Sequence, residues 1–287
     1  MPLADRTLSL RDGRSLAYAE WGDASGAPVV LFHGSPSSRF FCPNETVTVS
    51  AAVRLITADR PGYGRSDFDP KRTILGWVDD VTELVDALEL ARFAVVAHSS
   101  GGPYALACAI GLASRLSGVG LVSSVAPLDE APGAHDRLDH DERALVELAR
   151  ADRAAAMRTV AARAQWLIEQ PELFLEAPRP EPDRALLAEP AVSAMFLTAL
   201  REAVRDGLDG YACDEILERR PWGFKLADVK VDVYLWHGGL DPYIPLADAE
   251  YVARTLPSCR PTFHPDDGHG LILSRWGEIL SALHESA

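Results

Sequence analysis

Three side chains of the types that carry out nucleophilic catalysis are spread along this sequence: Ser99, Asp241 and His269. A serine hydroxyl is a poor nucleophile at neutral pH, so it needs an imidazole within hydrogen-bond reach to accept its proton and later to protonate the leaving group. An ionised carboxylate holds that imidazole in the correct tautomer and stabilises its cationic form. The three residue types are those of a catalytic triad, which would cleave its substrate through an acyl-Ser99 intermediate if the fold brings them together.

Ser99 stands at a predicted change from strand to helix. Five apolar residues, 93–97, run into it, and Gly101-Gly102 then opens an apolar helical pattern over residues 103–112. A serine at such a sharp turn, a nucleophile elbow, presents its hydroxyl clear of the sheet edge, beside free N–H groups at the helix start. The motif reads Ala97-His98-Ser99-Ser100-Gly101, with Ala in place of the first glycine of the usual GxSxG. A serine here is also a common helix N-cap, so its role depends on what the rest of the chain supplies.

Apolar runs predict the strands that would position these residues. Residues 28–32 form a continuous apolar run, as in a strand buried on both faces of a parallel sheet, and three further largely apolar runs are interpreted as buried strands of the same kind: residues 54–58, 119–122 and 231–236. An antiparallel hairpin is predicted over residues 7–22 around an Asp-Gly turn, and a helix over residues 72–90 from apolar residues spaced three and four apart. The alternation of strands and helices predicts an α/β fold with a mostly parallel, doubly wound sheet. In such sheets, chemistry gathers at the carboxyl ends of the strands.

No buried strand is predicted between residues 128 and 225. This stretch is helical in pattern, and the prolines at positions 171, 178, 180 and 182 predict a non-helical link within it. We interpret residues 128–225 as a helical cap, or lid, inserted into a core domain formed by residues 1–127 and 226–287. Most aromatic residues of the cap are expected to pack in its own interior, and Trp166 is a candidate for binding the substrate.

The chain order of nucleophile, acid and histidine is that of one particular fold. On this order and on five motifs, the sequence resembles the α/β-hydrolase superfamily: His33-Gly34-Ser35-Pro36, Asp59-Arg60-Pro61-Gly62-Tyr63-Gly64-Arg65-Ser66, Ala97-His98-Ser99-Ser100-Gly101-Gly102, His237-Gly238-Gly239-Leu240-Asp241 and Gly268-His269-Gly270. The resemblance implies the α/β-hydrolase fold and a carboxylesterase-like serine hydrolase that needs no cofactor. It assigns the oxyanion hole to the backbone N–H groups of Ser35 and Ser100, each such donor being worth about 3–4 kcal/mol.

Other residues compete for some of these roles. Asp129, which follows the strand predicted to end near residue 122, is an alternative acid, whereas Asp266 and Asp267 are too near His269 in sequence to reach the far nitrogen of its ring. If Ser99 is not the nucleophile, the adjacent Ser100 is the next candidate. Structural roles, rather than proton transfer, are expected for the remaining histidines near the motifs: His33, His98 and His237.

The expected substrate is a small, apolar molecule with an ester, thioester, lactone or amide bond. Two other functions are compatible with the same residues: hydrolysis of a carbon–carbon bond by the same triad, and a non-hydrolytic ligand-binding or lyase role on the same fold. Dehalogenases and epoxide hydrolases of this superfamily use an aspartate nucleophile, so a serine at the elbow argues against both.

Composition excludes several partners. The 287 residues carry a formal net charge of −14, which repels nucleic acids and anionic membranes. No apolar run approaches the roughly 18 residues needed to span a bilayer, and residues 1–6 lack the apolar stretch of a signal peptide, so a cytoplasmic location is expected. The four cysteines lack metal-ligand spacing, so we expect free thiols and no metal site. Nothing in the sequence indicates an oligomeric state.

Overall fold

A sheet of eight strands forms the centre of the computed structural model, which describes residues 1–284. The strands are β1 Ala4–Ser9, β2 Ser15–Gly22, β3 Ala27–Phe32, β4 Val53–Ala58, β5 Phe93–His98, β6 Leu116–Val122, β7 Val233–Gly238 and β8 Cys259–His264. Their order across the sheet is β1-β2-β4-β3-β5-β6-β7-β8. β2 pairs antiparallel with β1 and β4, and the other pairs are parallel. The predicted mostly parallel sheet and its N-terminal hairpin are confirmed.

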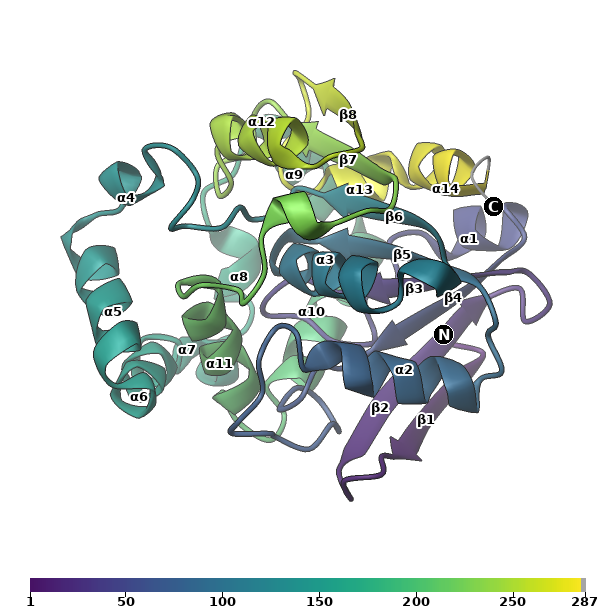
Figure 1. The fold of residues 1–287 in the computed structure, drawn as a ribbon, viewed down its shortest axis with the longest axis horizontal. Helices are drawn as coiled ribbons and strands as arrows, with labels where there is room; N and C mark the ends of the chain where they lie inside the picture. The colour runs from purple at the N-terminus through teal and green to yellow at the C-terminus, as the bar shows by residue number, and fades with distance from the viewer. Residues whose placement is uncertain (285–287) are drawn as a thin grey trace.

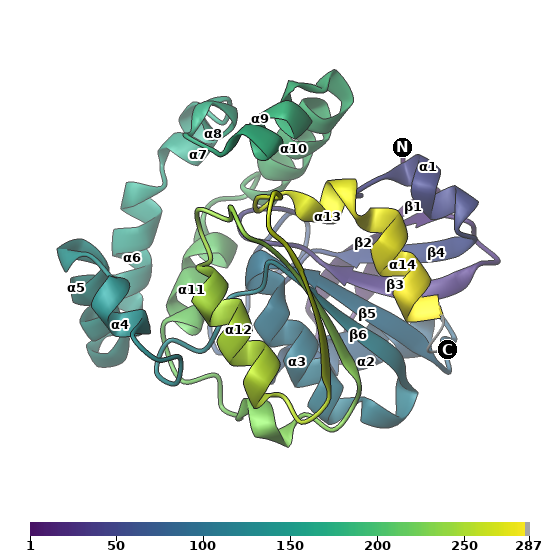
Figure 2. The same cartoon turned by 90° about the horizontal axis from the view of Figure 1, so that it is seen from above.

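Helices cover both faces of this sheet, which is why the central strands are mostly apolar (Figure 1, Figure 2). The helices outside the β6–β7 connection are α1 Glu45–Ser50, α2 Trp77–Ala87, α3 Gly102–Gly111, α12 Leu246–Thr255, α13 Leu271–Ser274 and α14 Trp276–His284. Side chains of α2, α3 and α12 share one hydrophobic core with the sheet, and those of α13 and α14 share the other. All six residues of β5 are buried between these two layers.

The helix predicted over residues 72–90 is shorter in the structure, where α2 begins at Trp77. Arg72 precedes it in a loop and is buried, because its guanidinium group binds the carboxylate of Asp214 and the backbone oxygens of Pro61 and Gly210. The helical spacing of apolar residues therefore extends to residues that precede the helix in the structure. Their conformation is set by contacts with distant parts of the chain.

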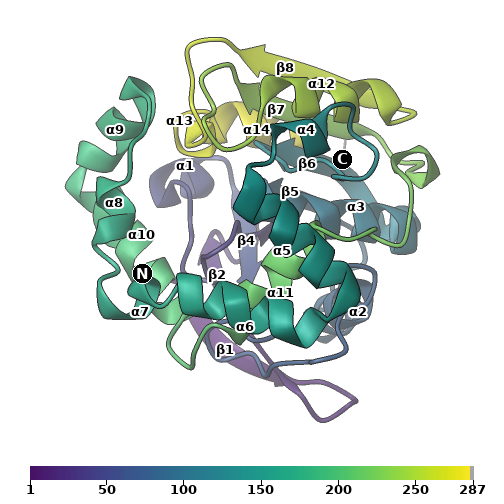
Figure 3. The same ribbon diagram turned by 90° about the vertical axis from the view of Figure 1, so that its left-hand side faces the viewer.

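Eight α-helices lie between β6 and β7 within the described residues, and we call them the inserted segment: α4 Ala134–Arg137, α5 His140–Ala151, α6 Arg153–Arg163, α7 Trp166–Glu169, α8 Leu173–Glu176, α9 Glu181–Ala188, α10 Pro190–Ala203 and α11 Asp209–Glu218. They gather on one side of the molecule (Figure 3). The prediction that prolines keep residues 171–182 non-helical is wrong in part, because α8 and α9 form there. Pro182 lies in the first turn of α9, where a residue without an N–H costs no helical hydrogen bond.

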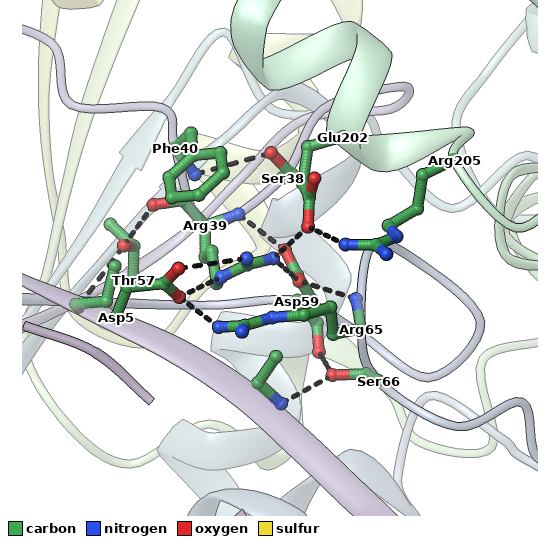
Figure 4. Close-up of polar contacts among 12 residues, drawn as sticks. Asp5, Ser38, Arg39, Phe40, Thr57, Asp59, Arg65, Ser66, Glu202 and Arg205 are labelled. Carbon is green, nitrogen blue, oxygen red and sulfur yellow. Dashed lines mark hydrogen bonds and ion pairs between the residues drawn. The ribbon is translucent and has the colours of Figure 1, made fainter. Parts of the chain in front are cut away.

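Buried ion pairs tie α10 and α11 to the sheet. Arg39, which is 1% exposed, lies between three carboxyl groups from distant parts of the chain (Figure 4). Its guanidinium nitrogens are 2.7 Å from Asp5 of β1, 2.5 Å from Asp59 after β4, and 2.7 Å from Glu202 of α10. Asp214 of α11 is bound in a comparable way by arginines of the core. The inserted segment is therefore anchored through its last two helices.

Candidate active site

The connection between β5 and α3 has the geometry of a nucleophile elbow. Ser99 follows the last residue of β5 and takes a backbone φ of +54°, and a 3₁₀ turn, Ser99–Gly101, leads into α3. A residue other than glycine in this left-handed region costs about 1–2 kcal/mol, and such strain is concentrated at functional sites. Ala97 is fully buried between β3 and β6, so a small side chain suits the position where the motif usually has glycine.

His269 and Asp241 meet side chain to side chain. They follow β8 and β7, two neighbouring parallel strands, so both loops leave the same edge of the sheet. Nδ1 of His269 lies 2.8 Å from Oδ2 of Asp241. The other carboxylate oxygen, Oδ1, accepts hydrogen bonds from the backbone N–H groups of Tyr243 at 2.9 Å and Ile244 at 3.0 Å. The carboxyl group is thus fixed with one oxygen directed at the imidazole.

The surroundings of Asp241 favour its ionised form. Burial of the carboxyl raises its pKa, but the hydrogen bond and charge of His269 and the two backbone N–H groups lower it more, and the pKa of Asp241 falls below its ordinary value. A carboxylate that stays ionised stabilises an imidazolium beside it. The ring of Tyr243 meets the imidazole of His269 edge-on, with centroids 5.1 Å apart, and limits its movement.

The alternative acids lie elsewhere. Asp129 pairs with Arg150 and His135 in the inserted segment, and Asp267 is ion-paired with Arg275 at 2.7 Å. Within residues 1–284, Asp241 is the carboxylate that contacts the ring of His269.

Two of the remaining histidines support their own loops, as expected. Nδ1 of His33 lies 2.6 Å from the backbone oxygen of Gly34, and Nε2 of His237 lies 3.0 Å from that of Ile244. His98 instead supports the loop that contains His269, since its Nε2 lies 3.1 Å from the backbone oxygen of His269. Burial and the charge of nearby His269 lower the pKa of His98 to about 3, so its ring is neutral and donates this hydrogen bond from Nε2.

The loop that contains Ser35 packs directly against the elbow. A Cβ on Gly34 would lie 3.2 Å from Cβ of Ser99, so a larger residue there would crowd the elbow. The hydroxyl of Ser35 is 2.5 Å from that of Tyr63, which donates to Asp214 of α11 at 2.7 Å. Among the described residues, the backbone N–H of Ser35 has no hydrogen-bond acceptor. It is available to a ligand beside Ser99, as an oxyanion-hole donor must be.

Ser99 and His269 lie at the junction of two cavities. The smaller one, about 90 Å³, is lined mainly by apolar side chains: Phe41, Phe174, Leu186, Leu187, Phe196 and Leu273. The larger one, about 530 Å³, extends toward α11 and has charged groups on its wall: Arg179, Glu215, Glu218, Arg219 and Asp248. Ser35 and Tyr243 line both. Trp166, predicted to bind substrate, is on the wall of the larger cavity and is 36% exposed.

The described residues contain no group of three or more His, Cys, Asp and Glu side chains placed to hold a metal ion. The four cysteines are free thiols: Cys42, Cys108, Cys213 and Cys259. In residues 1–284, no helix has both the length and the apolar character needed to cross a membrane.

The match to a family model covers most of the chain. The model described as the alpha/beta hydrolase family matches residues 29–282. The chain belongs to the alpha/beta hydrolase family. This alpha/beta hydrolase is 29% identical over 285 residues to a non-heme chloroperoxidase of Streptomyces lividans, with 96% of each chain covered.

Solved structures share the fold of this alpha/beta hydrolase. A bromoperoxidase from Bacillus anthracis superimposes with a TM-score of 0.72 at 22% identity, covering 99% of both chains. A thermophilic esterase from Thermogutta terrifontis gives a TM-score of 0.68 at 23% identity, covering 98% of this chain and 97% of the esterase.

Sequence reasoning missed three acidic residues around the site, all in the inserted segment. Asp183 of α9 is bonded to the backbone of His269 and Gly270. Asp214 and Glu218 lie one turn apart on α11, facing the core and the elbow. Their signal in the sequence is a pair of acidic residues at i and i+4 among the apolar residues of a helix, a spacing that places both on one face. For Asp183 the sequence has no comparable signal.

Proposed function

We propose that this protein is a serine hydrolase that needs no cofactor and cleaves an ester, thioester, lactone or amide bond of a small substrate through an acyl-Ser99 intermediate. The observation that carries the proposal is the 2.8 Å contact between His269 and Asp241, with His269 lining the same two cavities as the strained Ser99. Nucleophile, orienting carboxylate and base thus follow β5, β7 and β8, three parallel strands whose carboxyl ends lie at the same edge of the sheet, as a triad on this fold requires.

In the proposed reaction, Oγ of Ser99 attacks the carbonyl carbon while Nε2 of His269 takes its proton, and Asp241 stabilises the imidazolium. The backbone N–H groups of Ser35 and Ser100 bind the oxyanion of the tetrahedral intermediate. His269 then protonates the leaving group as its bond to carbon breaks. A water molecule, deprotonated by His269, attacks the acyl-Ser99 ester, and the acid leaves with the hydroxyl of Ser99 restored.

We further propose that residues 128–225 act as the cap over this site. Phe174, Leu186, Leu187 and Phe196 of the inserted segment supply most of the apolar wall of the smaller cavity. A small, mainly apolar cavity beside the proposed nucleophile favours a short apolar group on one side of the scissile bond, because burial of each CH₂ group contributes about 0.8 kcal/mol.

The test is hydrolysis of p-nitrophenyl esters over a series of acyl chain lengths, combined with labelling by a fluorophosphonate. We expect hydrolysis that is fastest for short acyl chains and a fluorophosphonate adduct on Ser99. Ser99→Ala should lower kcat by on the order of 10⁶, whereas Ser100→Ala keeps its backbone N–H and should retain most of the activity. No hydrolysis across the series and no adduct would overturn the proposal, and a Ser99→Ala variant that keeps its rate would move the nucleophile to Ser100.

A second activity is suggested by the relative from Streptomyces lividans, a non-heme chloroperoxidase whose identity to this protein extends over 96% of the chain. Hydrogen peroxide in place of water would cleave the acyl-Ser99 ester to a peroxy acid and free Ser99, and the peroxy acid would then oxidise a halide. We expect bromination of a dione in the presence of acetate, hydrogen peroxide and bromide. Bromination that persists in Ser99→Ala would exclude this route.

A further inference from the structure

Glu218 brings a carboxyl group to the wall of the larger cavity, beside the residue that follows the nucleophile. It is the last residue of α11 and hydrogen-bonds the side chain of Ser100, and the same cavity is also lined by Ser99 and His269. Asp214, one turn earlier on the same face, is bound to Arg60 at 2.7 Å and to Arg72. Those ion pairs fix α11 against the core, and they thereby hold Glu218 at the elbow.

One oxygen of Glu218 lacks a partner. Its Oε1 is buried and has no hydrogen bond with any described residue. The neighbouring carboxyl groups on α11 are paired, Asp214 with two arginines and Glu215 with Arg219 at 2.7 Å. A buried polar atom left without a partner costs about 1–3 kcal/mol and calls for an explanation. In a cavity that contains the nucleophile, a bound ligand supplies one.

The charges around Glu218 show which kind of ligand group fits. Burial raises the pKa of Glu218 to about 8. The charges of Glu215 and Asp214 raise it further, against lowering by a hydrogen bond with the side chain of Ser100 and by the charge of Arg219, so the neutral form of the carboxyl is favoured. Its charged neighbours are already balanced, since Asp214 and Glu215 are matched by their arginines. A cationic ligand group would gain little there. A neutral carboxyl group both donates and accepts, which matches a hydroxyl.

We propose that Glu218 is a substrate-binding residue whose carboxyl group hydrogen-bonds a hydroxyl on the part of the substrate that occupies the larger cavity. The substrate would then have a short apolar part in the smaller cavity and a hydroxylated part in the larger one, with the scissile carbonyl at Ser99 between them. This inference rests on the proposed hydrolase function and specifies its substrate class.

The test compares ester pairs that differ by exchange of a terminal methyl for a hydroxyl. Pentyl butyrate and 4-hydroxybutyl butyrate vary the alcohol part, and butyl heptanoate and butyl 6-hydroxyhexanoate vary the acyl part. For one of the pairs, we expect wild-type kcat/KM to be about tenfold higher for the hydroxylated ester, the effect of one buried hydrogen bond. Glu218→Leu should abolish this preference, and Glu218→Gln, which still donates and accepts, should keep it. Glu169→Leu, at an exposed site in the inserted segment, is the matched control and should also keep it.

Three results would overturn the inference: a wild type without preference in either pair, a Glu218→Leu variant with the wild-type preference, or faster hydrolysis of 4-aminobutyl butyrate than of its hydroxyl counterpart. Failure of the hydrolase proposal looks different, because the wild type would then cleave none of the esters and would not form the fluorophosphonate adduct on Ser99. The thermal midpoint shows whether Glu218→Leu folds. If it does not fold, the test rests on the wild-type ratios of kcat/KM and on Glu218→Gln. Loss of the preference for the hydroxylated ester in Glu218→Gln then counts against the inference.

Discussion

The carboxylate of Asp183 holds the backbone of His269. Its Oδ2 accepts the N–H of His269 at 3.0 Å, and its Oδ1 accepts the N–H of Gly270 at 2.9 Å. The approach is so close that a Cβ on Gly268 would lie 2.4 Å from Oδ2, which explains a glycine at that position. Because Asp183 belongs to α9, the inserted segment contacts the main chain of the proposed base directly.

Removal of Asp183 should therefore affect catalysis more than substrate binding. Asp183→Ala leaves the part-buried N–H groups of His269 and Gly270 without this acceptor, so the loop should shift and the imidazole of His269 should lose its fixed position at the site. We expect kcat to fall about 10- to 100-fold, since a displacement of about 1 Å can cost 10² in rate, with KM changed much less. Asp183→Asn keeps one acceptor oxygen and should lose less.

Steady-state kinetics on a p-nitrophenyl ester and the rate of fluorophosphonate labelling of Ser99 measure this effect. Glu181→Ala, an exposed acidic residue in the first turn of the same helix, is the matched control and should behave as wild type. A rise in KM at constant kcat would show that Asp183 only anchors the inserted segment.

The two candidate acids are distinguished by parallel amide substitutions. In Asp241→Asn the amide NH₂ favours the wrong tautomer of His269, and we expect kcat to fall by on the order of 10⁴, as in triads generally. Asp129→Asn removes only contacts to Arg150 and His135 and should leave kcat within a few-fold of wild type. Equal losses in the two variants, measured at one pH with folding confirmed by circular dichroism, would contradict this assignment.

The hydroxyl of Tyr63 links the loop of Ser35 to α11, so its loss should weaken stabilisation of the oxyanion. Tyr63→Phe removes the contacts to Ser35 at 2.5 Å and to Asp214 at 2.7 Å, and we expect kcat to fall about tenfold. Ser35→Ala keeps the backbone N–H but removes the same link. Because both changes break the same hydrogen bond between Ser35 and Tyr63, the double variant should lose little more than Tyr63→Phe alone. Additive losses in kcat would mean that the link does not position the loop.

The sequence predicted those parts of the structure that depend on local pattern. Buried strands follow from continuous apolar runs, and the Asp241–His269 contact from the two residues following neighbouring parallel strands. The contacts across the inserted segment could not be predicted in this way. Asp183 and His269 are brought together by the packing of α9 on the loop after β8, and no periodicity records which helix covers which loop. The prediction that a helix begins at residue 72 failed for the same reason, because Arg72 is held outside α2 by its ion pair with Asp214 of α11.

Asp214 is expected to contribute most to stability among the buried charges that join the inserted segment to the core. It is fully buried, pairs with Arg60 and Arg72, and accepts a hydrogen bond from Tyr104 at 2.6 Å. Asp214→Asn leaves two buried guanidinium groups without a counter-charge, so we expect the free energy of unfolding at pH 7 to fall by about 3–5 kcal/mol. Glu172→Gln, which breaks an exposed ion pair with Arg201, should leave the urea midpoint unchanged.

The stability that Asp214 contributes should decrease in acid. Burial raises the pKa of Asp214, but Arg60, Arg72 and the hydroxyl of Tyr104 outweigh it, and the pKa falls well below its ordinary value. A carboxyl whose pKa is depressed in the folded state stabilises that state above its unfolded pKa of about 4, and the contribution disappears as pH falls through the folded value. The difference in unfolding free energy between wild type and Asp214→Asn should thus be constant from pH 7 to 5 and narrow below pH 4, as measured by urea denaturation. A difference that widens in acid would show that Asp214 is not held as a carboxylate between its two arginines.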